Sequence, residues 1–202
     1  MKMVETTNET AARATEQTTA ARMAERAEVL EAARAYLRRG WRVVPLRPGE
    51  KAPALAHWPD LRLDAGEVPI WYGPAVVAGY GVGLLLGAAS GGLVDVDCDT
   101  REAALAAAEL LPPTGRVSGR YSRPASHYWY VCTDDEPPRT AKFAFAEDGV
   151  GGKDAAPTML LELRSTGCQT LAPPSKHPSG ERACWERARE PGRVDGHTLR
   201  RA

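Results

Sequence analysis

The sequence has 202 residues, and its 26 Lys and Arg balance 26 Asp and Glu, so the formal net charge is zero. A hydrophobic share of 43% and a charged share of 26% exclude a disordered or fibrous chain. The neutral balance also excludes a protein that coats nucleic acid through bulk positive charge, although it leaves room for a local basic groove.

The cysteines Cys98, Cys132, Cys168 and Cys184 contain no C-x-x-C spacing, so we expect no structural zinc. Scattered cysteines in a chain of this length are typical of reduced thiols in a cytoplasm. No apolar run approaches the roughly 20 residues that cross a bilayer, and the N-terminal sequence lacks a signal-peptide core. We therefore expect a cytoplasmic protein without a membrane partner, monomeric as an isolated domain.

Residues 1–22 are expected to form a flexible arm, because they are rich in Thr, Glu and Ala and poor in large apolar side chains. Apolar residues then recur at helical spacing from about residue 23, and Gly40 marks the end of this helix. A strand is predicted over 41–46. We expect 23–186 to be the main domain and the polar, basic 187–202 to be a tail, in the position of a linker to a further domain.

Two short apolar segments, 81–87 and 93–97, flank a Gly-containing turn and predict a hairpin. Asp99 is expected to cap the helix that follows, and a Pro-Pro pair ends that helix. Strands dominate the centre of the chain, so the pattern predicts an α+β fold with a mixed or antiparallel sheet. The other predicted strands cover 127–132, 158–163 and 168–172.

Three acids stand in apolar strands. Asp95 and Asp97 project from the same face of their predicted strand, roughly 7 Å apart, because side chains alternate along a strand. Two such carboxylates repel each other, and a divalent cation relieves the repulsion. Alternatively, both are strand-end residues that cap a turn. The third acid, Glu162, either points to solvent, pairs with Arg164 or meets the same metal.

Basic residues gather in a different segment: 116–123 holds three arginines and no acid, whereas 95–109 holds five acids and one base. Two opposed patches of this kind suit a metal-bound triphosphate, and they predict weak, salt-sensitive binding of nucleic acid. His127 opens an aromatic strand close to the arginines, and a proline-rich loop presents Ser175 and His177 together. Each of these three residues also fits an ordinary core or surface role.

Taken in order, these segments resemble the bifunctional DNA primase/polymerase domain of the archaeo-eukaryotic primase superfamily, which is often found in plasmid and phage replication proteins. The resemblance spans about residues 32–185. The segments that carry it are G-W-R-V-V-P-L at 40–46, E-K-A-P at 50–53, S-G-G-L-V-D-V-D at 90–97, the aromatic strand from His127, L-E-L-R at 161–164, and P-P-S-K-H-P-S-G at 173–180.

The resemblance implies an archaeo-eukaryotic primase-type α+β fold, in which a catalytic sheet like that of an RNA-recognition motif (RRM) packs with an N-terminal α/β unit. It implies that Asp95, Asp97 and Glu162 hold two Mg²⁺ or Mn²⁺ ions and act with His127 in catalysis. Glu162 departs from the pattern, since Asp is commoner there. The residues implied for nucleotide binding are His127, Arg164, Ser175, Ser126, Lys51 and His177.

The implied activity is that of a template-directed DNA primase/polymerase, a nucleotidyltransferase of a plasmid, phage or mobile-element replication system. The implied partners are single-stranded DNA template and primer, NTP or dNTP, and a replicative helicase domain or protein. Two alternatives stay open. One is a metal-dependent phosphodiesterase or nuclease that uses the same three carboxylates, and the other is a non-catalytic DNA-binding module of replication initiation.

Overall fold

The computed structural model describes residues 2–76, 78–145 and 158–202, with side chains from Thr15 onward except that of Phe145. Its helices are α1 (Lys2–Arg38), α2 (Val68–Tyr72), α3 (Arg101–Leu110) and α4 (Gly196–Arg201). Its strands are β1 (Val43–Leu46), β2 (Gly81–Leu85), β3 (Leu93–Cys98), β4 (Arg116–Arg120), β5 (Arg123–Cys132), β6 (Ala141–Phe145), β7 (Thr158–Arg164), β8 (Gln169–Leu171), β9 (Cys184–Ala188) and β10 (Gly192–Val194).

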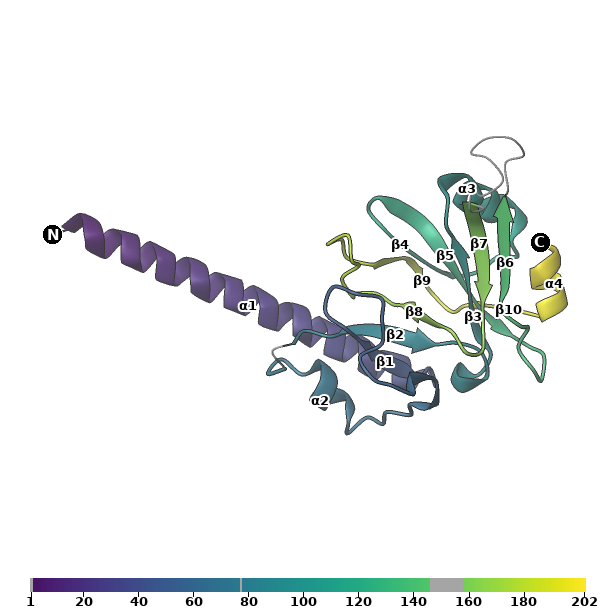
Figure 1. The fold of residues 1–202 in the computed structure, drawn as a ribbon, viewed down its shortest axis with the longest axis horizontal. Coiled ribbons are helices and arrows are strands. Elements are labelled where there is room, and N and C mark those ends of the chain that lie inside the picture. The colour runs from purple at the N-terminus through teal and green to yellow at the C-terminus, as the bar shows by residue number, and fades with distance from the viewer. Residues whose placement is uncertain (1, 77, 146–157) are drawn as a thin grey trace.

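The strands form two sheets (Figure 1). The smaller sheet has the order β1-β2-β8, and the larger has the order β6-β7-β3-β5-β4-β9, with β10 beside β5. All of these pairs are antiparallel except β10 with β5. The α+β class predicted from the sequence is confirmed.

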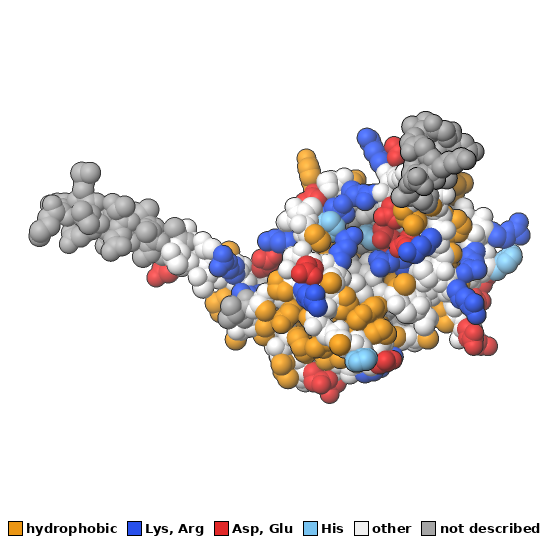
Figure 2. Space-filling view, viewed as in Figure 1, with side chains coloured by type: hydrophobic (Ala, Val, Ile, Leu, Met, Phe, Trp, Pro, Cys, Tyr) orange, Lys and Arg blue, Asp and Glu red, His pale blue; other side chains and the backbone are white. Residues whose placement is uncertain are grey.

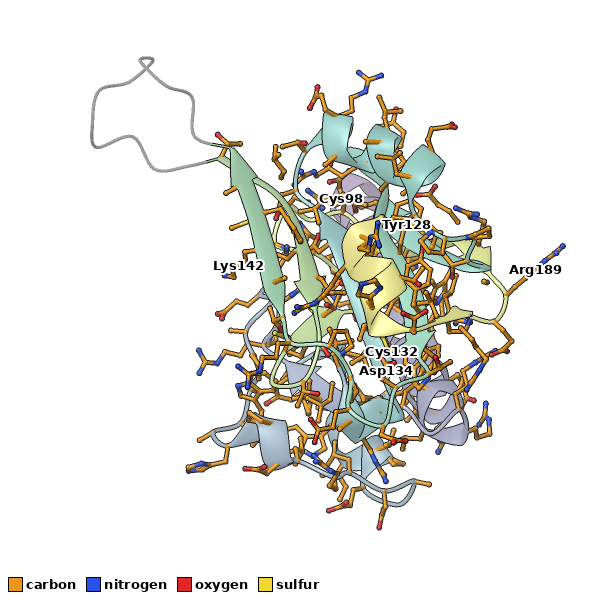
Figure 3. The ribbon with its side chains drawn as sticks, turned by 90° about the vertical axis from the view of Figure 1, so that its right-hand side faces the viewer. Cys98, Tyr128, Cys132, Asp134, Lys142 and Arg189 are labelled. Atoms are coloured by element: carbon orange, nitrogen blue, oxygen red, sulfur yellow. The ribbon has the colours of Figure 1, made fainter. Side chains whose placement is uncertain are left out.

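The central strand β3 separates two environments by the alternation of its side chains. Val94, Val96 and Cys98 are buried in a core that also contains Ala107 of α3 and Leu199 of α4. Figure 3 shows both helices on this side of the sheet, over Cys98, Tyr128 and Cys132. Asp95 and Asp97 therefore project from the opposite face, which α3 and α4 leave open.

A second core joins the C-terminal part of α1 to the smaller sheet. Leu30, Ala33 and Tyr36 of the helix are buried against Trp41 and Val82. Towards the N-terminus α1 runs away from the body of the protein, and its side chains over 15–22 are exposed (Figure 1). Of the arm expected over 1–22, residue 1 and the side chains of 2–14 lie outside the described residues, and the backbone from Lys2 is helical.

Two local predictions were wrong. β2 and β3 do not form a hairpin, because β2 pairs with β1 and β8 whereas β3 pairs with β5 and β7. A single bridge between Gly87 and Leu93 joins the two segments. The cap of α3 is Thr100, whose side chain accepts a hydrogen bond from the backbone N–H of Ala103, while the N–H of Asp99 donates to Leu160.

The segment expected to be a polar tail belongs to the folded body. Residues 187–188 end β9, which pairs with β4, and β10 pairs with β5. Asp195 caps α4, and the buried Leu199 joins the core beneath that helix. The arginines that gave this segment its basic character lie on its surface, so composition alone concealed its apolar anchor.

Candidate active site

Strand register brings the predicted acids and the histidine to one face of the larger sheet. β3 lies between β5 and β7, and Asp97 is paired with both His127 and Glu162. Asp95, two residues earlier, is paired with Arg164 on one side. Because paired residues point to the same face, all five side chains share the open face of the sheet.

The ligand atoms of Asp95, Asp97 and His127 lie within 4.8 Å of one another. The Nδ1 atom of His127 is 3.0 Å from Oδ2 of Asp95 and 3.5 Å from Oδ1 of Asp97. Among the described residues, this is the only group of three or more His, Cys, Asp or Glu side chains close enough to share one metal ion.

Asp95 is fully buried, and its two carboxylate oxygens have different surroundings. Oδ2 accepts a hydrogen bond of 2.8 Å from the Thr170 hydroxyl in addition to its contact with His127. Oδ1 is buried and has no hydrogen-bond partner among the described residues. A buried anionic oxygen without a donor is costly, and a cation at that position would satisfy it.

Glu162 shares this face, but its carboxylate is engaged elsewhere. Oε1 is 2.9 Å from the Lys142 ammonium of β6, and Oε2 is 3.5 Å from the Arg164 guanidinium. Arg164 also lies 3.6 Å from Oδ2 of Asp97. The structure thus places Glu162 beside the two aspartates without bringing its oxygens into the group that could share one ion.

The crowding of charges alters the proton affinity of two members of the site. Burial raises the pKa of Asp97, and the neighbouring charge of Asp95 raises it further, against the opposing effect of His127 and Arg164. Burial alone would lower the pKa of His127, but the carboxylates of Asp95 and Asp97 outweigh it and raise the pKa. Both shifts reflect an excess of negative charge in a poorly solvated place.

A cavity beside the acids collects most of the residues expected to bind a nucleotide. Its lining includes three cationic side chains and no acid, which suits a phosphate group. Five expected residues lie in this wall: Lys51, Ser126, His127, Arg164 and His177. The other residues that line it are Ser118, Gly119, Arg120, Thr170, Leu171 and Ala183.

The two serines have different roles. Ser126 is buried, and its hydroxyl has no hydrogen-bond partner among the described residues. Ser175 does not line the cavity that contains His127. Its hydroxyl accepts from the backbone N–H of Val82 at 2.7 Å and donates to the Val82 carbonyl at 3.2 Å. Ser175 thus fastens the proline-rich loop to β2.

His177 presents one nitrogen as a hydrogen-bond donor. The backbone N–H of Ser179 donates to its Nδ1 at 3.0 Å, so the ring proton of the neutral form is on Nε2. Burial, together with the nearby charges of Arg120 and Lys51, lowers the pKa of His177 to about 4. At neutral pH this imidazole is therefore uncharged, and the cavity owes its positive charge to Lys51, Arg120 and Arg164.

Sequence reasoning missed Thr170 and Glu181, and it included Arg120 in the basic segment without singling it out. Thr170 was a hydroxyl in a buried strand segment, which is a signal for a polar partner, whereas Arg120 was only one of three arginines in a basic segment. Glu181 accepts hydrogen bonds from the Ser122 N–H and hydroxyl at 2.8 and 2.6 Å and from Arg120 at 3.2 Å. No sequence pattern marked it.

Figure 2 shows charged and histidine side chains gathered on the upper part of the open face, whereas hydrophobic side chains are more frequent below them, around α2 and the smaller sheet. In the described part of the chain, no helix is long and apolar enough to span a membrane.

Arg116, which was grouped with the basic patch, lies away from the cavity and packs against Trp41 and Trp185.

No curated protein matches this sequence. The family model described as bifunctional DNA primase/polymerase, N-terminal, does match it, over residues 33–195. This range covers most of the chain and contains every residue of the site described above. The family resemblance inferred from the order of the motifs is therefore confirmed, and the chain belongs to the Prim-Pol family, that of bifunctional DNA primase/polymerase N-terminal domains.

Proposed function

We propose that the chain is a nucleotidyltransferase that synthesises DNA on a template, as a primase or polymerase, in the replication system of a plasmid, phage or mobile element. The observation that carries the proposal is the register of β3, which sets Asp97 opposite both His127 and Glu162 beside a cationic cavity. Membership of the Prim-Pol family supports it. We also propose that the domain works in the cytoplasm with a replicative helicase domain or protein.

The fold that we propose is of the archaeo-eukaryotic primase type. The larger sheet is covered on one face by α3 and α4, and its other face packs in part against α1 and the smaller sheet through Leu93 and Trp129. This arrangement is consistent with an RRM-like catalytic unit. The smaller sheet with α1 corresponds to the N-terminal α/β unit. The acids of the larger sheet and Lys51, which follows β1 of the smaller sheet, then belong to one site between the units.

Asp95, Asp97 and Glu162 are the residues that would hold two Mg²⁺ or Mn²⁺ ions. Carboxylate oxygens are the ligands that these cations prefer, and the unpartnered, buried Oδ1 of Asp95 fits such a ligand. Glu162 would join them by exchanging its contacts with Lys142 and Arg164 for the metal. Bound there, the ions would acidify the attacking hydroxyl and neutralise charge on the phosphates.

The cationic side chains around the cavity would bind the triphosphate of the incoming nucleotide. Arg164 offers the planar fork that matches phosphate oxygens, and His127 and His177 add ring N–H donors. Lys51 and Ser126 also line this cavity. Ser175 acts indirectly in this proposal, since it fixes the loop that carries His177.

A primer-extension assay tests this function. The wild-type protein is incubated with a labelled primer on a DNA template, Mg²⁺ or Mn²⁺, and NTP or dNTP. We expect elongation of the primer, loss of elongation in the Asp95→Ala, Asp97→Ala double variant, and DNA binding by that variant. Asp60→Asn removes a carboxylate outside the described cluster and should behave as wild type. Shortening of the primer would indicate a nuclease, and binding without either reaction would indicate a non-catalytic module.

A further inference from the structure

The turn between β4 and β5 holds an aromatic ring out in solvent. Tyr121 is 96% exposed, the highest value for a large hydrophobic side chain in the described part of the chain. A single exposed aromatic residue is ordinary in itself. Its position at the rim of the candidate active site, next to Arg120 of the cavity, makes it a candidate for ligand contact.

The turn that carries Tyr121 is fixed rather than loose. Its next residue, Ser122, donates both its N–H and its hydroxyl to the Glu181 carboxylate, at 2.8 and 2.6 Å. Arg120, on the other side of Tyr121, donates to the same carboxylate at 3.2 Å. Because Ser122 is held through its backbone and Arg120 through its side chain, a ligand that stacks on the ring has less conformational freedom to immobilise.

A largely apolar groove that carries two arginines starts at this turn. It has a volume of about 490 Å³ and lies between α3 and the start of β5. Arg101 and Arg123 are among its lining residues, which include no Asp or Glu, and Leu105 adds apolar surface. Neither arginine forms a salt bridge with any residue that the structure describes. The two arginines therefore favour a partner with anionic groups, and the apolar part of the groove favours flat or apolar groups on the same partner.

The groove lies on the face of the sheet that α3 covers, opposite the catalytic cavity, and the two linings have one residue in common. Ser126 lines both. β5 begins at Arg123, whereas its pairing with β3 extends only as far as the Asp97–His127 pair, so the start of β5 stands beyond the end of β3. A flexible anionic chain that leaves the acids can therefore pass this end of the sheet, beside the Tyr121 turn, and reach the groove.

We propose that Tyr121, Arg123 and Arg101 bind an unpaired strand of the DNA template, with a base stacked on Tyr121 and phosphates at the two arginines. This assignment rests on the proposed function, which requires a template beside the acids. The chemistry favours single-stranded nucleic acid because it combines regularly spaced anions with flat rings. An acidic peptide would satisfy the arginines but leave the exposed ring unused.

The test measures the affinity of labelled single-stranded oligonucleotides by fluorescence anisotropy over a range of salt concentrations, without nucleotide. We expect Tyr121→Ala to weaken binding roughly tenfold with an unchanged salt dependence, and Tyr121→Trp to retain it. Arg123→Ala should make the slope of log K against log salt shallower by about 0.7, the contribution of one phosphate of a single strand. An abasic oligonucleotide should bind wild type and Tyr121→Ala equally weakly.

Ile70→Ala and Arg189→Ala are matched controls. Ile70 is 68% exposed on α2, and Arg189 points away from the body in Figure 3. Both should bind as wild type does. Equal binding by Tyr121→Ala and wild type, equal binding of abasic and normal strands, or no saturable binding by wild type at low salt would each overturn the proposal. Displacement of both strands by a polyglutamate peptide as readily as by DNA would point to a peptide partner instead.

Primer extension separates this inference from the function on which it rests. If Tyr121→Ala raises the KM for template and leaves the KM for dNTP and kcat unchanged, both stand. If Tyr121→Ala extends the primer with an unchanged KM for template, the proposed role of Tyr121 is wrong and the polymerase function still stands. If the wild-type protein binds DNA through Tyr121 but never extends a primer, the polymerase function is wrong and the binding site stands.

Discussion

Asp97 of β3 and Glu162 of β7 lie directly opposite each other in the larger sheet, yet the Glu162 carboxylate is held by two cations. Lys142 contributes one of them from an exposed position, with 63% of its side chain accessible. Lys142 therefore occupies an oxygen of Glu162 that metal binding would need. Because pairs with an exposed partner are weak, a divalent ion can displace this lysine.

Substitution of Lys142 should consequently reduce activity far less than substitution of Glu162. We expect Lys142→Ala to keep primer extension within about threefold of wild type, because an exposed ion pair contributes little. Glu162→Gln preserves the size of the side chain but removes a deprotonated ligand, so we expect a loss of roughly a hundredfold or more. Initial rates over a Mg²⁺ titration measure both. Equal losses in the two variants would show that the pair itself, rather than the carboxylate, supports the activity.

Thr170 should act through Asp95. Its hydroxyl donates to Oδ2 of Asp95 at 2.8 Å and accepts from Arg164 at 3.1 Å, and the residue is buried. Thr170→Val keeps the shape and leaves a buried carboxylate short of a donor, so the free energy of unfolding should fall by about 1–3 kcal/mol. Metal affinity should fall by roughly 10- to 100-fold, as expected when the partner of a ligand is removed.

Thr170→Ser is the matched control, because it restores the hydroxyl without the methyl group. We expect it to recover most of the metal affinity. Denaturant unfolding and a Mn²⁺ titration separate the two effects. If Thr170→Val lost stability but bound metal normally, Thr170 would be a structural partner of Asp95 and not a positioning residue.

What the sequence could predict depended on local periodicity. The alternation around Asp95 and Asp97 predicted their common face, because side-chain direction along one strand needs no information from elsewhere. Their closeness to His127 and Glu162 depends on strand pairing across 30 and 65 positions, which periodicity does not encode. Only the family resemblance predicted that these four residues share one site. The resemblance did not predict the contact of Glu162 with Lys142.

The local predictions that failed also failed for physical reasons. β4 is absent from the predicted strands because its arginines, serine and glycine have low strand preference. Its pairing with β5 and β9 overrides that preference. The expected hairpin of β2 and β3 is replaced by a change of sheet at Gly87. This residue has a φ of 70°, and a Cβ there would lie 2.0 Å from Oγ1 of Thr166, so only glycine fits.

Glu181 should stabilise the turn of β4 and β5 in a pH-dependent way. Hydrogen bonds from the Ser122 side chain and backbone lower the pKa of Glu181 to about 2 from its ordinary value of 4.5. Because the folded-state pKa is the lower one, the contribution is complete above about 4.5 and is lost as the pH falls towards 2. Glu181→Gln should therefore be less stable than wild type at pH 7, and this difference should shrink as the pH approaches 2.

Urea unfolding of both proteins at pH 7, 5 and 3 measures this difference. Glu190→Gln is a comparison at another site, since Glu190 is an exposed carboxylate whose pKa is lowered by its bond with Arg39 and which lies away from the turn. Its loss of stability should also shrink at low pH but should leave the turn of β4 and β5 unchanged. A Glu181→Gln deficit that stayed constant over the whole range would show that the hydrogen bonds do not depend on the charge of the carboxylate.

Arg116 and Arg120 belong to the same strand but should affect different properties. Arg116 is buried, with its guanidinium carbon 5.0 Å from the ring centroid of Trp41 and 4.1 Å from that of Trp185. It also donates hydrogen bonds to the carbonyls of Ala188 and Arg189. Arg116→Ala should lower the free energy of unfolding by about 2–4 kcal/mol and leave the KM for dNTP unchanged.

Arg120→Ala is the matched comparison, because Arg120 lines the cavity that we assign to the triphosphate. It should raise the KM for dNTP with a small effect on stability, since its partner Glu181 keeps the hydrogen bonds from Ser122. Arg116→Lys should not restore stability, because an ammonium cannot stack between two indole rings as a planar guanidinium does. Denaturant unfolding and steady-state kinetics on the three variants test whether the two arginines affect different properties. A raised KM for dNTP in Arg116→Ala, measured where that variant is fully folded, would contradict the prediction.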